Sequence, residues 1–431
     1  MKRRTDTGTG TGAAGGTGGG LARRDLLTAA AAAGAAGLAT GAAAAHAAAA
    51  PRDTGEPDPA LAPARSRAGA RGGLPPALLT PTPSQVHLVA VDLRADPGAP
   101  AREAARRVLR IWSREAAALH EHGLAALVEG APSQGLRPAS LGVTLGLGAS
   151  LLAAVGLADR VPPHLEDLPA FAADHLEPAW CGGDLLLHVG AEDPVVLSSA
   201  VGHLLGAVAA DVRVRWSLAG FHRSAAAADD PSATPRNLMG QIDGTVNPRP
   251  SDALFGPQVL AAHPEPALAW MDGGAYLVVR RIRMLLDDWF ALDPRDREAV
   301  IGRRLDTGAP LGGAAEDDRP DLAATGDDGS PAIPLDAHIR LAAPENTLGA
   351  RMLRRGFSYD QGWDARGRRR AGLLFTAWQA DPRTGFTPVQ RALDEGGDAL
   401  GPFIRHEGSA LFAVPPVRGG APWTAHDLLG G

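Results

Sequence analysis

Three stretches of the sequence share one local pattern, and this pattern limits the possible folds more than any other feature. Each stretch has an apolar, strand-like run, then an Asp-Pro pair, then apolar residues at helical spacing; the pairs occupy residues 96–97, 193–194 and 381–382. An aspartate can cap a helix, and a proline is tolerated at its first position, so we expect a helix to begin at each pair. The chain should therefore alternate strands with helices.

The order of these elements indicates a duplication. Further strand-like runs lie at residues 141–147, 212–221, 275–284 and 409–416. Together they give the order β-α-β, β-α-β within residues 84–225 and a partial echo of it up to residue 416. A doubly wound nucleotide-binding fold is the alternative, but no glycine-rich phosphate loop follows the first strand. We predict an α+β protein with two ferredoxin-like (split βαβ) domains and antiparallel sheets, at residues 84–225 and 226–431.

The N-terminal residues differ in composition from the rest. Arg23 and Arg24 stand before a weakly hydrophobic, alanine-rich run, which is the layout of an export signal of the twin-arginine type. A low-complexity tail with a chance arginine pair is the alternative. We expect residues 1–50 to be this signal and residues 51–83 to be a Pro/Ala-rich linker. The twin-arginine translocase would then export the folded protein to an extracellular, periplasmic or cell-envelope location.

Composition restricts the partners of the chain. Its 431 residues are 45% hydrophobic and carry a formal charge of -6, so a globular core is expected and nucleic-acid binding is not. No run after the expected signal reaches the ~18 apolar residues that a membrane-spanning helix needs, so we expect no transmembrane anchor in the mature protein. Cys181 is the single cysteine, which excludes an internal disulfide.

The segment NLMGQIDGTVNP, residues 237–248, holds Asp243 within a frame of glycine, amide and proline residues. Taken alone, an Asp-Gly pair most often marks a surface turn. Here Gly240 allows the backbone to approach a flat ligand, and Asn247 with Pro248 fixes the exit of the segment. We interpret Asp243 as a functional carboxylate.

A second candidate segment runs from His338 to Asp360, with Arg354 and Arg355 near its end. On spacing alone, a structural histidine and solvated arginines would be the more common interpretation. Combined with a constrained aspartate, however, a histidine and an arginine make up the set that a haem peroxidase requires. These are an axial imidazole, an acid-base group and a cation beside the peroxide.

These motifs resemble those of the dye-decolourising peroxidases. GQIDGT fits the GxxDG signature of that family, and the surrounding ATPRNLMGQIDGTVNP is similar to the exported, deferrochelatase-like branch. Further similar segments follow in order: WMDGGAYLVVRRIRMLLDDW, VIGRRLDTGAPLGG, AHIRLAAPENTLGARMLRRGFSYD, LLFTAWQADPRTGFTPVQRAL and GSALFAVPP. The resemblance covers residues 84–416. In one departure, Gln241 stands where many members have an aromatic residue, which bears on the polarity of the haem edge.

The resemblance implies two ferredoxin-like halves, with one haem b per chain held mainly by the C-terminal half. It makes His338 the proximal iron ligand and Asp243 the distal carboxylate, which would shuttle a proton during peroxide cleavage. Arg354 matches the distal arginine better than Arg355 does. This arginine would stabilise developing negative charge and could also pair with a haem propionate.

The resemblance also implies a set of residues around the haem: Gly240, Gly244, Leu373 and Phe375. The two glycines belong to the signature, and the two apolar residues would roof the distal pocket. Asp398 would accept the N–H of the proximal imidazole, with Asp394 as a competitor for this role.

The function implied is that of a haem-dependent peroxidase, which reduces hydrogen peroxide through a ferryl intermediate and oxidises bulky organic reductants such as dyes and phenolics. Because the base is a carboxylate, we expect turnover to be fastest at acidic pH. Trp378 and Tyr359 are candidates for electron transfer from the surface, although both could simply be core residues. Release of iron from haem, as in a deferrochelatase, is one alternative. Non-catalytic haem binding is another, which Asp243 and Arg354 disfavour.

Overall fold

The computed structural model describes residues 74–79, 81–122, 130–230, 232–326 and 328–430. The expected export signal and most of the expected linker therefore lie outside the described residues. The end of that linker segment belongs to the fold, since Pro76–Leu78 forms a short 3-10 helix and Leu78 is fully buried. Within the described ranges, no helix combines the length and apolarity needed to cross a bilayer.

The N-terminal half repeats the order strand, helix, strand. Its main elements are β1 (Gln85–Leu93), α2 (Ala99–His122), β2 (Gly142–Leu147), α3 (Ala149–Ala154), β3 (Leu185–Ala191), α4 (Pro194–Gly206) and β4 (Val212–Phe221). The strands lie in the order β4-β1-β3-β2, and each neighbouring pair is antiparallel. This is the strand order of a ferredoxin-like sheet.

The C-terminal half repeats this order. Its strands are β5 (Ala275–Met284), β6 (Leu353–Trp363), β7 (Arg369–Gln379) and β8 (Ile404–Val414). Its helices are α5 (Phe255–Val259), α6 (Leu286–Ala291), α7 (Pro294–Ile301), α8 (His338–Leu341), α9 (Phe386–Glu395) and, at the end of the chain, α10 (His426–Leu429). The strand order β8-β5-β7-β6 matches that of the first half. The predicted α+β class with a duplicated antiparallel arrangement is confirmed.

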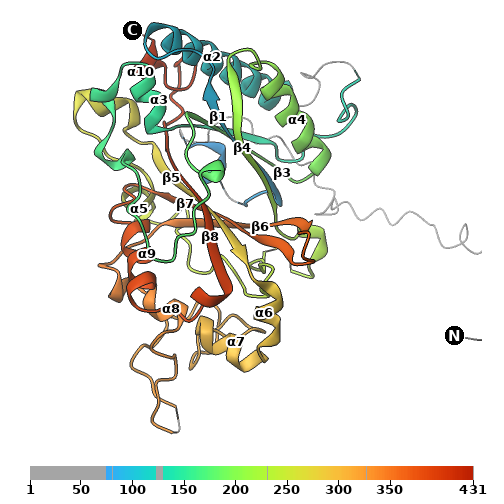
Figure 1. Cartoon of the computed structure of the whole chain (residues 1–431), viewed down its shortest axis with the longest axis vertical. Helices are drawn as coiled ribbons and strands as arrows, with labels where there is room; N and C mark the ends of the chain where they lie inside the picture. The colour runs from blue at the N-terminus through green and yellow to red at the C-terminus, as the bar shows by residue number, and fades with distance from the viewer. Residues whose placement is uncertain (1–73, 80, 123–129, 231, 327, 431) are drawn as a thin grey trace, which may run out of the picture. The chain divides into compact units, whose positions relative to one another are not determined.

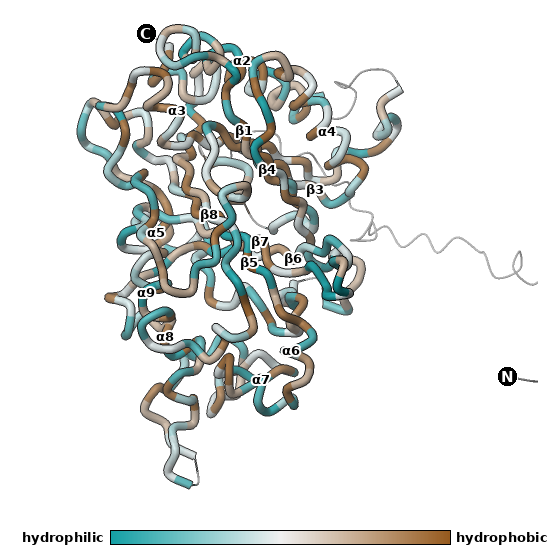
Figure 2. Tube along the Cα trace, in the orientation of Figure 1, coloured by the Kyte–Doolittle hydropathy of each residue, from teal (hydrophilic) through white to brown (hydrophobic). Residues whose placement is uncertain are grey.

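The two sheets join into one closed barrel, which the sequence pattern does not predict. One seam pairs β2 with β8 through Leu147 and Ala413, and the other pairs β4 with β6 through Phe221 and Ser358. Figure 1 shows the elements of the first half, from blue to green, together at one end of the barrel, and α6, α7, α8 and α9 at the other. Figure 2 shows hydrophobic residues along many of the strands and hydrophilic residues in the turn between β6 and β7.

Of the three expected Asp-Pro helix starts, the structure contains one with the predicted geometry. The Asp193 carboxylate accepts hydrogen bonds from the backbone N–H groups of Val195 and Val196, both at 2.9 Å, and α4 begins at Pro194. In contrast, α2 begins only at Ala99 and α9 only at Phe386. The third prediction fails because the Asp381 carboxylate accepts from the backbone of Arg383 at 2.8 Å, which makes a turn instead of a cap.

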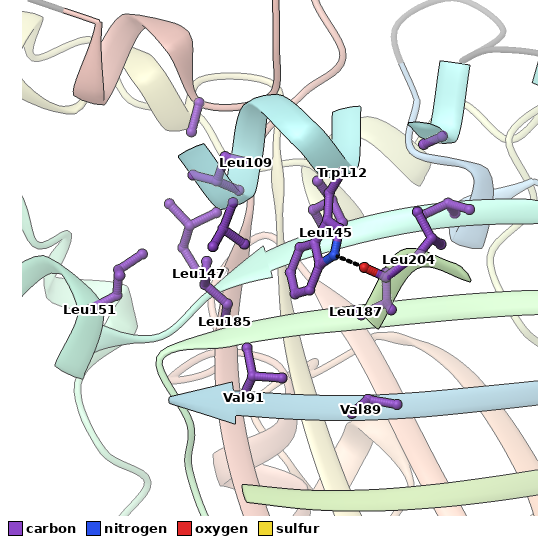
Figure 3. Packing of buried hydrophobic residues seen from close by; sticks show 14 of the residues in the cluster. Val89, Val91, Leu109, Trp112, Leu145, Leu147, Leu151, Leu185, Leu187 and Leu204 are labelled. Atoms are coloured by element: carbon purple, nitrogen blue, oxygen red, sulfur yellow. Dashed lines mark hydrogen bonds between the residues drawn. The ribbon is translucent and has the colours of Figure 1, made fainter. Parts of the chain in front are cut away.

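The core of the N-terminal half lies between its sheet and its helices. Apolar residues recur at helical spacing along α2, and Val108, Leu109 and Trp112 are fully buried. Figure 3 shows Leu109 and Trp112 over the leucines of β2 and β3, with a hydrogen bond from Trp112 Nε1 to the Leu204 carbonyl, 2.8 Å long. This bond links α2 to α4 through the core.

Replacing Trp112 with alanine should lower the free energy of unfolding by about 3–5 kcal/mol, because it empties a buried indole site and removes the donor to Leu204. Urea unfolding of the purified protein measures this. The control is Trp363→Ala on β6, where the side chain is 70% exposed and the change should stay within about 0.5 kcal/mol. Equal losses in the two variants would contradict the described packing.

Candidate active site

A cavity of about 1030 Å³ opens in the C-terminal half, at the upper end of the size range of small-molecule sites. Most of its wall comes from residues on β5, β6, β7, α8 and α9 and from the segment that holds Asp243. The structure brings together six of the predicted residues in this wall: Asp243, His338, Arg354, Leu373, Phe375 and Asp398. Gly240 and Gly244 flank Asp243 in the chain and do not line the cavity themselves.

His338 is the first residue of α8, and Asp398 fixes its orientation. The imidazole Nδ1 lies 2.8 Å from Asp398 Oδ2, while Asp398 Oδ1 accepts the backbone N–H of Leu400 at 3.0 Å. Burial disfavours the charged imidazole, but the charge and the hydrogen bond of Asp398 outweigh it and raise the pKa of His338. The other nitrogen, Nε2, has no hydrogen-bond partner among the described residues. His338 therefore offers one oriented nitrogen to a ligand in the cavity.

Asp394, the competing carboxylate, has different partners. Its two oxygens accept the backbone N–H groups of Ala172 and Ala173 at 2.6 and 2.8 Å. These two alanines belong to the N-terminal half of the chain. Asp394 therefore fastens a loop of that half to the cavity wall, and the structure sets Asp398 rather than Asp394 against His338.

The segment around Asp243 is a tight loop that directs the carboxylate into the cavity. Residues 236 and 242 form an antiparallel bridge, and Gly240 and Gly244 have φ angles of 84° and 128°, which favour glycine. Asn237 Nδ2 donates to Asp243 Oδ2 at 3.2 Å. The constrained loop that the sequence indicates is therefore present, with Asn237 as an additional support.

Gly356 on β6 leaves space for the Asp243 carboxylate, a role that the sequence analysis did not predict. A Cβ atom at this position would lie 3.2 Å from Asp243 Oδ2 and 3.2 Å from Leu373 Cδ1. A glycine inside a strand often marks such a close approach, so this signal was available in the sequence.

Arg354 and Arg355 are adjacent on β6 and therefore point to opposite faces of the sheet. The Arg354 guanidinium lines the cavity and donates to the Thr245 carbonyl at 3.1 Å. Its backbone is held by Asn247, whose side chain accepts from the Arg354 N–H at 2.9 Å and donates to the Arg354 carbonyl at 2.8 Å. Arg355 instead donates to the Leu78 carbonyl at 3.1 Å and is buried. The preference for Arg354 agrees with this geometry.

A second cation in the wall, Arg303, was not predicted. It donates to the carbonyls of Gly308 and Glu316 at 2.6 and 2.8 Å. Burial and the nearby Arg354 lower its pKa. Two neighbouring guanidinium groups favour anionic groups, such as carboxylates, in this part of the cavity.

Aromatic residues divide between the cavity and the core. Phe375 lines the cavity and lies 6.2 Å from the ring of Phe386, whereas Trp378 and Tyr359 are 0% and 1% exposed. Neither Trp378 Nε1 nor Tyr359 Oη has a hydrogen-bond partner among the described residues. The two candidates for surface electron transfer are therefore core residues.

The donor set of the cavity fits haem better than a bare metal ion. Across the described residues, no group of three or more His, Cys, Asp or Glu side chains could hold a metal ion. The oriented imidazole nitrogen of His338 in a large, partly apolar cavity, with arginines in its wall, suits iron that brings its own macrocycle and carboxylate groups.

The two halves match two parts of one family. The family model described as "Dyp-type peroxidase, N-terminal" matches residues 75–222, and the model described as "Dyp-type peroxidase, C-terminal" matches residues 234–419.

Comparison with individual proteins indicates the same family. The chain is 56% identical over 388 residues to a dye-decolorizing peroxidase of Thermobifida fusca, across 87% of this chain and 90% of that protein. It is 33% identical over 366 residues to a deferrochelatase of Escherichia coli K12, across 82% and 85% of the two proteins. The solved structure of ferric DtpA from Streptomyces lividans has a TM-score of 0.81 and 43% identity, and covers 87% of this chain and 100% of that one. The chain therefore belongs to the Dyp-type peroxidase family.

Proposed function

We propose that His338 binds the iron of haem b through Nε2 and that Asp243 and Arg354 act on hydrogen peroxide in the same cavity. The protein is a haem peroxidase, and bound haem supplies the redox centre for the reaction. The observation that carries the residue assignment is the contact of 2.8 Å between His338 and Asp398, which leaves Nε2 free beside a cavity that also contains a carboxylate and a guanidinium.

Asp243 is the proton carrier in this proposal. One of its oxygens, Oδ2, already accepts from Asn237, so Oδ1 is the better placed to receive a proton from peroxide and return it to the departing oxygen. Arg354 supplies positive charge near the oxygen atom that becomes negative. Its anchoring to Thr245 and Asn247 keeps the guanidinium in position without a conformational change.

Asp398→Asn should weaken the basicity of the His338 imidazole and reduce haem affinity or peroxide turnover by about 10–100-fold. Haem titration followed by absorption, together with the iron-histidine stretching frequency in Raman spectra, measures the effect. Asp394→Asn is the matched control, because that carboxylate contacts Ala172 and Ala173 and not His338. An unchanged stretching frequency in Asp398→Asn, or the same shift in both variants, would refute the ligand assignment.

Asp243→Asn should slow the reaction of the haem-loaded protein with hydrogen peroxide by about 10²–10⁴-fold, because the amide cannot carry the proton. Stopped-flow absorption measures this rate. Asp317→Asn is the control, since Asp317 also lines the cavity but is exposed and has no assigned role. A rate within about threefold of wild type for Asp243→Asn would show that another group moves the proton.

Release of iron from haem is the second candidate, supported by the similarity to a deferrochelatase. The higher identity to a dye-decolorizing peroxidase favours peroxide reduction with an organic reductant. The products distinguish the two functions. Iron-free porphyrin, formed under reducing conditions without peroxide, would support iron release, whereas peroxide-dependent oxidation of a dye with the haem intact supports the peroxidase.

We also propose that residues 1–50 direct export of the folded protein by the twin-arginine route, on the strength of Arg23 and Arg24 before the alanine-rich run. Changing both to lysine should leave the haem-loaded protein inside the cell, as fractionation with immunoblotting measures. Arg3 and Arg4 form a second arginine pair without a following apolar run, so their change to lysine is the control and should not affect export. If only the variant changed at Arg3 and Arg4 stayed inside the cell, the export signal would lie at those residues and not at Arg23 and Arg24, which would contradict the proposal.

A further inference from the structure

A second group of titratable side chains lies outside the cavity wall. It consists of His164 from the N-terminal half and His263, Tyr276 and Asp381 from the C-terminal half. The His164 ring stacks on the Tyr276 ring at 5.3 Å with an angle of 12°, and meets the His263 ring edge-on at 4.8 Å. His164 Nε2 also lies 3.3 Å from Asp381 Oδ2. None of these residues takes part in the peroxide chemistry proposed above.

The central contact of this cluster joins a phenol to an imidazole. Tyr276 Oη lies 2.8 Å from His263 Nε2, and the two residues are 0% and 4% exposed. Burial raises the pKa of Tyr276 and lowers the pKa of His263. Tyr276 therefore keeps its proton at neutral pH, and its neutral partner has a nitrogen that can accept it.

This contact sets Tyr276 apart from the other oxidisable residues considered above. A phenol that loses an electron becomes a strong acid, so its oxidation is favourable when a base takes the proton at the same time. The chain has two tyrosines. Tyr359 has no hydrogen-bond partner for its hydroxyl among the described residues, and the guanidinium of Arg281 lies 5.0 Å from its ring centre, where positive charge opposes oxidation.

The position of Tyr276 connects the cavity to the surface. Tyr276 and Arg280 lie on the same face of β5, four residues apart and hence separated by roughly 13 Å, and Arg280 lines the cavity. On the other side, the side chain of His164 is 21% exposed. Glu265, 62% exposed, lies 4.0 Å from His263 Nδ1. An electron can therefore pass between the cavity and a reductant at the surface through one buried residue.

We propose that Tyr276 is a redox-active residue of this peroxidase and that His263 holds its proton while it is oxidised. Tyr276 loses one electron to the peroxide-oxidised haem site, and its phenolic proton moves to His263 Nε2. A bulky aromatic reductant at the surface near His164 and Glu265 then returns one electron, and the proton moves back from His263 to the phenolate oxygen. The net change is one electron transferred from the reductant to the haem site. This proposal rests on the haem peroxidase function described above.

Because the chain has two tyrosines, one substitution at a time leaves a single tyrosine that could carry a tyrosyl radical. The haem-loaded protein is mixed with hydrogen peroxide, frozen, and examined by electron paramagnetic resonance. Wild type and Tyr359→Phe should give a radical signal that narrows when the protein is produced with ring-deuterated tyrosine, and Tyr276→Phe should lack it. A signal that persists in Tyr276→Phe, or one that ring-deuterated tyrosine does not change, overturns the proposal.

His263 acts through Tyr276, so its test separates proton transfer from packing. His263→Gln can still accept the phenol hydrogen bond through its amide oxygen but cannot take the proton. We expect it to reduce the tyrosyl signal and the rate of dye oxidation by about tenfold or more. Wild-type levels of both in His263→Gln would show that the histidine serves only packing and would overturn its role.

Different results would overturn the proposed haem function and this inference. Absence of a haem absorption band or of peroxide consumption in the wild type would overturn both. Wild-type peroxide consumption together with an unchanged radical in Tyr276→Phe would overturn the inference alone.

Discussion

The alternation of side chains along three neighbouring strands determines which residues reach the cavity. Arg280 on β5 pairs with Phe375 on β7, which in turn pairs with Gly356 on β6, so these three residues form one row across the sheet. Next to it, Leu373 continues the apolar surface. A shift of one residue in any of these pairings would turn the row into the barrel interior and remove the cavity wall. The register of the sheet is thus the constraint on which the site depends.

The same strand order produces a packed core in one half and a cavity in the other, and the crossovers explain the difference. In the N-terminal half the first crossover contains α2, a long amphipathic helix that fills the space over its sheet with residues such as Trp112. In the C-terminal half the described part of the corresponding segment, between β5 and β6, contains the short helices α6, α7 and α8, a 3-10 helix at Pro344–Asn346 and several turns. This long, irregular connection carries Arg303 and His338, as is common for segments that provide functional residues.

The sequence was sufficient for the elements that depend on local patterns. The strands at 212–221 and 275–284 have the predicted bounds, because apolar runs with clear turn residues at both ends define them. It was not sufficient where the bounds of a strand depend on its pairing with a strand distant in the sequence. The last strand begins at Ile404, before the predicted residue 409, because β5 pairs with this segment across a register shift at Arg281 and Ile282. The barrel seams rest on single residue pairs, which leave no periodic signal.

The site shows the same division. The motif containing Asp243 is legible because its glycines and proline act locally, whereas His338 is indicated by the resemblance to the family and not by its spacing. The choice between Asp394 and Asp398 is not legible, since both are carboxylates near the end of α9 and only the folded chain shows that one accepts from a backbone loop and the other meets His338. The support of Arg354 by Asn247 joins residues that are 107 positions apart. Such contacts follow from topology and not from a motif.

Contacts from the N-terminal half complete the cavity wall, so the two halves form one functional unit. Asp174 pairs with the buried guanidinium of Arg280, and the backbone of His175 donates to the carbonyl of His406 at 3.0 Å. Burial and the neighbouring Arg280 lower the pKa of His406 to about 3, so this histidine stays neutral and adds no second positive charge beside Arg280. A guanidinium buried without Asp174 would be costly, because a buried charge needs a partner. The wall of the C-terminal cavity therefore depends on residues 172–175 of the other half.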